Sequence, residues 1–176
     1  MKIAVVLALM LLVAGVVLWR TRSATREPNA AADVNVVMRE AAADAIETAK
    51  AEHDVTLDYS SQSVEQVEAI LARIYDEQAG APIPLDREKD EAWRWGAYVG
   101  EVIRRTSPGG GHWEIDHEAA GPRSFPVRLA ERDSFPITWC RKRLRNGPED
   151  NVWHKFQILY GPESREIAPP AEGDVQ

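Results

Sequence analysis

The apolar run near the start of the chain constrains its fold more than any other sequence feature. Residues Ile3 to Trp19 form a stretch of seventeen residues without a charged or strongly polar side chain. As a helix rising about 1.5 Å per residue, this run spans about 25 Å, close to the roughly 30 Å hydrocarbon core of a bilayer. Trp19 would then lie at the interface and Arg20 among the headgroups. The sequence therefore predicts a transmembrane anchor over residues 1–19.

A cleaved signal peptide followed by an exported domain is the alternative interpretation of this run. Such a peptide needs a charged start, a shorter apolar core and a cleavage site between small residues. Here Lys2 is the only charged side chain before the core, and the core ends in Trp-Arg-Thr-Arg. The first alanine of the trio at 30–32 lies eleven residues beyond the core. These features favour an anchor that is retained.

Positive charge around the span predicts its orientation, because the more positive flank stays in the cytoplasm. Three arginines follow the span before the first acid, Glu27, whereas only Lys2 and the chain amine precede it. We therefore expect a single-pass protein whose domain lies in the cytoplasm, with an exported domain as the alternative.

The rest of the chain is acidic. Residues 27–176 hold 17 Lys and Arg against 28 Asp and Glu, a net charge of −11. This balance argues against nucleic acid as a partner, since nucleic-acid binding requires a basic surface. The single cysteine, Cys140, excludes an intrachain disulfide and a cysteine-rich zinc site. We expect no cofactor.

One dense basic run, "RKRLR", contrasts with this acidic background. It is a candidate for binding an acidic partner or lipid headgroups. The alternative is a strand edge that charge keeps soluble. The candidate binding residues are Arg141, Lys142, Arg143 and Arg145.

The remaining pattern predicts an α+β domain over residues 31–162, joined to the anchor by a polar linker at 20–30 and followed by a flexible tail at 163–176. Apolar periodicity indicates helices at 31–53, 63–80, 86–106 and 150–161. Alternation indicates strands at 54–60, 112–116, 126–130 and 136–144. Consecutive strands favour a small antiparallel sheet packed by helices. The alanine-rich first helix is expected to pack on the core, with pairing to a second chain as the alternative.

The stretch "GGGHWEIDHE", residues 109–118, is the one that first suggests chemistry. Its glycines leave a helix and enter a strand, which is the wrong polarity for a phosphate loop. In a strand, His112, Glu114 and Asp116 would share an outward face, too widely spaced to reach one metal ion. Trp113 would lie on the buried face. We therefore interpret the stretch as a turn and a strand, with no metal site.

No catalytic motif is visible in the sequence. An enzyme such as a hydrolase would have to assemble its site from dispersed residues, and a nucleophilic thiolate at Cys140 would need a nearby base. The candidate catalytic residues for this alternative are His112, Glu114 and Cys140.

The stretch "WGAYVGEVIRR" and the "GGGHWEI" that follows resemble a motif of an uncharacterised bacterial domain-of-unknown-function family. In that family, a helix with Gly-x-Tyr-x-Gly-Glu-x-Ile-Arg-Arg precedes a Gly-Gly-x-Trp turn and strand. The resemblance covers about residues 54–160 and implies a bacterial source, hence a bacterial inner membrane, but supplies no catalytic residues. The motif positions expected to define the fold are Gly96, Tyr98, Gly100, Glu101 and Trp113. Glu101 and Arg105, four residues apart, are expected to pair.

These observations together favour a protein-interaction or scaffold module anchored in the membrane. Its expected partners are the lipid bilayer, through Ile3 to Trp19, and an unidentified protein near the membrane. The five tryptophans after the anchor are expected to leave some aromatic surface exposed for binding. The sequence leaves the oligomeric state and the partner's identity open.

Overall fold

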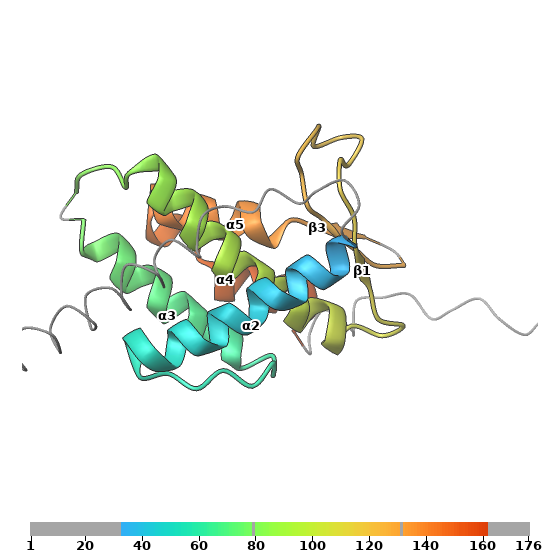
Figure 1. Cartoon of the computed structure of the whole chain (residues 1–176), viewed down its shortest axis with the longest axis horizontal. Helices are drawn as coiled ribbons and strands as arrows, with labels where there is room; N and C mark the ends of the chain where they lie inside the picture. Colours follow the sequence, from blue (N-terminus) through green and yellow to red (C-terminus); the bar gives the residue numbers. More distant parts are fainter. Residues whose placement is uncertain (1–32, 79, 131, 162–176) are drawn as a thin grey trace, which may run out of the picture. The chain divides into compact units, whose positions relative to one another are not determined.

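The computed structural model of the chain describes residues 33–78, 80–130 and 132–161 (Figure 1). The helices are α2 (Val34–His53), α3 (Ser63–Asp76), α4 (Leu85–Thr106), α5 (Pro136–Asn146) and α6 (Val152–Tyr160), with a 3-10 turn at Pro148–Asp150. The strands are β1 (His112–Trp113), β2 (Val127–Arg128) and β3 (Asp133–Ser134). They pair antiparallel in the order β1-β2-β3. Helices thus dominate an α+β domain that carries a small antiparallel sheet.

The predicted anchor, linker and tail lie outside the described residues. Among the helices that the structure does describe, none is long and apolar enough to cross a bilayer. The anchor at Ile3 to Trp19 therefore stays a prediction.

Helix α2 packs on the core through a stripe of small side chains, as the sequence predicts. Met38, Ala42, Ala45 and Ala49 are fully buried, and the alanines let α2 lie close against α4. An ion pair between Arg94 and Asp44, at 2.8 Å, joins the two helices at their margin. The apolar stripe of α2 is thus covered by α4 of the same chain.

Helix α4 is the central element of the fold. Every residue from Trp95 to Ile103 is buried, because α2 covers one side of the helix and α5 another. A Cβ atom on Gly96 would lie 2.4 Å from Cα of Ile137, and one on Gly100 would lie 2.1 Å from the Trp113 indole. Both positions therefore require glycine to admit their neighbours.

Glu101 holds β1 against α4. Its carboxylate is fully buried and accepts hydrogen bonds from Trp113 Nε1 at 3.0 Å and from Arg104 Nε at 3.0 Å. Arg105 Nε lies 3.3 Å from the same carboxylate, so the predicted pairing of Glu101 with Arg105 is confirmed. The motif positions define the packing of α4, as the sequence analysis expected.

This buried carboxylate is expected to make the domain sensitive to acid. Burial favours the neutral acid, but hydrogen bonds from Arg104 and Trp113 outweigh it and hold the pKa of Glu101 below its usual value. A lowered folded-state pKa stabilises the fold above the unfolded pKa, near 4.5, and this contribution is lost as the pH falls through the folded pKa. At neutral pH, Glu101→Gln should therefore lower the free energy of unfolding by about 2 kcal/mol.

Urea unfolding of wild type and Glu101→Gln at pH 7 and at stepwise lower pH checks this expectation. The difference between the two proteins should shrink as the pH falls below about 4.5. Glu47→Gln, at an exposed position of α2, serves as the matched control and should show no such trend. A Glu101→Gln deficit that stays constant down to acid pH would contradict the account.

The segment before α3 is not the predicted strand at 54–60. It runs without pairing, and Tyr59 adopts a positive φ of 62°. Its amide donates a 2.8 Å hydrogen bond to the buried Tyr98 hydroxyl, which also bonds Ser63 Oγ at 2.7 Å. The tyrosine of α4 thus satisfies a backbone group that a neighbouring strand would otherwise satisfy.

Tyr98→Phe is therefore expected to destabilise the domain by about 1–3 kcal/mol, because the Tyr59 amide loses its partner. Tyr75→Phe is the matched control, since no hydrogen bond of the Tyr75 hydroxyl is seen within the described part of the chain. Its effect should stay within about 0.5 kcal/mol. Denaturant unfolding followed by tryptophan fluorescence measures both, and equal effects would refute the role given to the Tyr98 hydroxyl.

The predicted strand at 136–144 is wrong, because these residues form helix α5. Pro136 stands at the first helical position, where its fixed φ favours the helix and its missing amide proton costs nothing. The buried residues of the segment are Pro136, Trp139, Cys140, Arg143 and Leu144, a helical spacing. The basic run therefore lies on a helix and is not a strand edge.

The strand at 112–116 is also shorter than predicted. Only His112 and Trp113 pair with β2, and Asp116 already has a φ of 65°. Trp113 is buried as expected, whereas Ile115, beyond the end of the strand, is 42% exposed. In the loop that follows, the Asp116 amide donates a hydrogen bond to the Ser124 carbonyl, which closes the loop.

Candidate functional site

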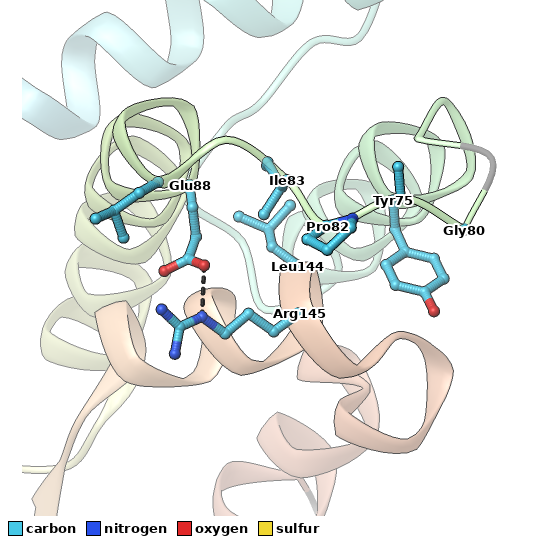
Figure 2. A pocket seen from close by; sticks show the side chains of 9 residues that line it. Tyr75, Gly80, Pro82, Ile83, Glu88, Leu144 and Arg145 are labelled. Carbon is cyan, nitrogen blue, oxygen red and sulfur yellow. Dashed lines mark hydrogen bonds and ion pairs between the residues drawn. The ribbon is translucent and has the colours of Figure 1, made fainter.

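A hollow of about 520 Å³ lies where the loop between α3 and α4 meets the end of α5 (Figure 2). Its floor is apolar, since Ile83 and Leu144 are buried there, and Leu85 at its margin is 52% exposed. The loop between α3 and α4 supplies Pro82, and α3 supplies the ring of Tyr75. An exposed leucine beside a concave apolar surface is a feature of sites that receive another side chain.

A buried carboxylate held by two arginines forms the charged side of the hollow. Glu88 is 3% exposed and accepts a hydrogen bond from Arg141 Nε at 2.6 Å and another from Arg145 Nε. Burial raises the pKa of Glu88, but the hydrogen bonds from Arg145 and Arg141 outweigh it, so the net shift is downward. Glu88 is therefore charged at neutral pH.

The two arginines keep donors free for a ligand. Their side chains are 44% and 48% exposed, and each uses only its Nε toward Glu88. Across residues 33–78, 80–130 and 132–161, the structure gives neither Arg141 nor Arg145 a further ion-pair or hydrogen-bond partner. One carboxylate thus faces two guanidinium groups, which leaves a local surplus of positive charge in an acidic domain.

The other two members of the predicted basic patch face elsewhere. Arg143 is 3% exposed, and its Nε donates to Glu68 at 2.6 Å, while Glu68 also accepts from the Val152 amide at 2.8 Å. Arg143 Cζ lies 5.6 Å from the centroid of the Tyr75 ring, and this ring also lines the hollow. Lys142 is exposed. The helix thus divides the run, and only Arg141 and Arg145 share the side that binds Glu88.

The structure brings two of the candidate catalytic residues, His112 and Glu114, together and places the third, Cys140, on another element. His112 Nε2 lies 3.1 Å from Glu114 Oε1, and Glu114 Oε2 lies 2.8 Å from Arg128 Nε, at the exposed margin of the sheet. The hydrogen bond from His112, together with the nearby charge of Arg128, holds the pKa of Glu114 below its usual value. This favours a permanent carboxylate and disfavours a general acid.

Cys140 lies elsewhere, in the core on α5. Its side chain is fully buried, and burial raises the pKa of its thiol, so the nucleophilic thiolate is disfavoured. The structure assigns this cysteine to packing.

A second histidine–acid pair, missed in the sequence, lies beside the sheet. His117 Nε2 is 2.7 Å from Asp133 Oδ2, and its Nδ1 is 3.1 Å from the Ala119 amide. Because an amide can only donate, Nδ1 carries no proton and Nε2 donates to Asp133. Both ring nitrogens are therefore engaged, and the pair fastens the loop after β1 without offering a general base.

The described residues also bear on the predictions about a metal site and about exposed tryptophans. In the part of the chain that the structure describes, no group of three or more His, Cys, Asp or Glu side chains is placed to hold a metal ion. The expectation of exposed tryptophans is wrong for this part. Trp95, Trp113 and Trp139 are buried, and Trp93 and Trp153 are half-buried against Phe125 and Phe156.

Comparison with known protein families, with curated proteins and with solved structures found no match. The resemblance of the α4 motif to a bacterial family therefore stays a prediction.

Of the charged residues at the hollow, the sequence pointed to Arg145 but gave no sign of Glu88. Glu88 stands in the acidic and basic stretch "DREKDE", where nothing distinguishes it from solvated neighbours. Its partners on α5, Arg141 and Arg145, lie 53 and 57 residues later in the sequence than Glu88. The only available signal was the four-residue spacing of these two arginines, which places them on one side of a helix.

Proposed function

We propose that this chain is a protein-interaction module held at a bacterial inner membrane by Ile3 to Trp19. The observation that carries the proposal is the arginine pair at the edge of an apolar hollow. Arg145 lines the hollow together with the exposed Leu85, and Arg141 is joined to it through the shared Glu88. Apolar contact combined with directed charge suits a polypeptide ligand. The scaffold role follows from combining this surface with an anchor.

The alternative of an enzyme receives less support. His112 and Glu114 form a hydrogen-bonded pair at an exposed edge, and Cys140 is buried on another element. No nucleophile lies within hydrogen-bond distance of a free base among these candidates, which is the minimum that nucleophilic catalysis requires. The interaction module is therefore the function that the geometry supports best.

Site-specific photo-crosslinking in living cells tests the proposal. A photoreactive amino acid placed at Leu85 in the full-length chain should give a discrete adduct with another protein. The same amino acid at Ile158, which is 61% exposed on α6, is the matched control and should give none. Both positions are exposed and apolar, so the comparison separates a specific surface from general stickiness.

The location of the adduct-forming chain is part of the same test. The membrane fraction should contain the adduct, and deletion of residues 3–19 should release the chain and abolish it. Equal adducts from Leu85 and Ile158, or none from Leu85 in the membrane-bound chain, would contradict the proposed function.

A further inference from the structure

We infer that the hollow binds a segment of a partner protein in which an Asp or Glu lies beside an apolar side chain. This inference rests on the proposed function and specifies the ligand of that same site. The carboxylate would bind the free guanidinium donors of Arg141 and Arg145, and the apolar side chain would enter between Leu85, Ile83 and Leu144.

Charge complementarity carries the first step. Arg141 and Arg145 bring two positive charges to one buried carboxylate, and both side chains remain almost half exposed. Their Nε atoms are engaged by Glu88, so their terminal nitrogens are the donors that remain for a ligand. Guanidinium groups bind carboxylates in a planar, two-bond geometry, which gives direction as well as attraction.

Glu88 also fixes the arrangement in advance. Each arginine is held by a hydrogen bond from its Nε to a carboxylate that α4 keeps buried. An arginine that is already ordered loses less side-chain entropy when it binds a second carboxylate. Glu88 therefore positions the pair, while its own charge weakens the attraction for an incoming acid.

The apolar side of the hollow decides between a polypeptide and a small anion. A phosphate or a headgroup would use the arginines alone and leave Leu85 exposed. Tyr75, Pro82, Ile83 and Leu144 form a concave apolar surface directly beside Arg145 (Figure 2). Burying an apolar side chain there contributes roughly 25 cal/mol per Å² removed from water, which a bare anion does not provide.

The test selects ligands with the full-length chain from a phage-displayed library of random heptapeptides. Enriched peptides should combine Asp or Glu with Leu, Ile, Val or Phe within two positions. A synthetic, fluorescently labelled copy of the most enriched peptide is then titrated against the chain and its variants by anisotropy. Changing its acid to the amide should weaken binding about tenfold or more, since charged hydrogen bonds contribute most strongly.

Three variants separate the contributions. Glu88→Gln keeps an oxygen that can accept a hydrogen bond from the arginines but removes the carboxylate charge that competes with the ligand, so it should tighten binding of the acidic peptide several-fold. Glu88→Gln combined with Arg141→Gln and Arg145→Gln removes all three charges, avoids a buried unpaired acid, and should weaken binding about tenfold or more. Lys142→Gln removes an exposed charge from the same helix and should leave binding unchanged. Circular dichroism melting verifies that each variant is folded.

The outcomes are distinguishable. Enriched peptides without an acid, or a triple variant that binds the peptide as well as wild type, would overturn the inference. A crosslinked adduct at Leu85 would still support the interaction module in either case. Dihexanoylphosphatidylglycerol that binds the wild type, is lost in the triple variant and displaces the peptide would identify a lipid headgroup and overturn it as well. Tighter binding by Glu88→Gln together with loss in the triple variant would support it.

Discussion

Gly96→Ala is expected to destabilise the domain by about 2 kcal/mol or more, against the usual preference of helices for alanine. The added Cβ would lie 2.4 Å from Cα and 2.8 Å from the amide nitrogen of Ile137, so the contact involves backbone that cannot rotate away. Overpacking typically costs about 1–3 kcal/mol and occasionally more, and a contact with backbone puts this case at the upper end of that range. The gain in helix propensity offsets only about 1 kcal/mol of it.

The sign of the effect decides whether α4 and α5 lie as close as the structure shows. Urea unfolding of the full-length chain measures it, with Ala43→Gly at an exposed position of α2 as the calibration of helix propensity. That control should cost about 1 kcal/mol. If Gly96→Ala instead stabilised the protein by a similar amount, the close approach of the two helices would be wrong.

Arg143→Met is expected to have the largest effect, a loss of about 3–5 kcal/mol in the free energy of unfolding. The change leaves Glu68 with the Val152 amide as its remaining partner in the core, and an uncompensated buried charge is costly. Adding Glu68→Gln removes that charge and should restore much of the loss, because a buried pair contributes less than the cost of breaking it.

The same unfolding experiment measures the single and double variants. Lys142→Met, at the exposed neighbouring position of α5, is the control and should change stability by no more than about 0.5 kcal/mol. A single variant as stable as this control, or a double variant less stable than the single one, would show that Arg143 does not pair with a buried Glu68.

The helical part of the fold could be predicted from the sequence because its apolar stripes have a clear period. The small side chains of α2 recur at helical spacing, as do Ala92, Trp95, Val99 and Ile103 in α4, so both sets mark a buried face without help from tertiary structure. Helix α5 escaped prediction because one of its buried positions is Arg143 and its start is rich in apolar residues typical of strands. A charged residue on a buried face hides the helical period, and only the partner, Glu68, explains it.

The candidate site was predicted only in outline. The sequence shows that arginines gather at 141–145, but their roles depend on which side of a helix each occupies. Arg143 is turned into the core, whereas Arg141 and Arg145 reach Glu88 on a helix more than fifty residues earlier. Such a contact comes from tertiary packing, which local patterns do not encode.

The central claim is that a partner segment occupies the hollow beside Arg145. Methyl NMR of the full-length chain in the presence of the selected acidic heptapeptide tests it most directly. The account predicts chemical-shift changes at the methyl groups of Ile83, Leu85 and Leu144, which line the hollow, and none at the exposed Ile115 or Ile158. Changes centred on Ile115 or Ile158, with the hollow unaffected, would contradict it.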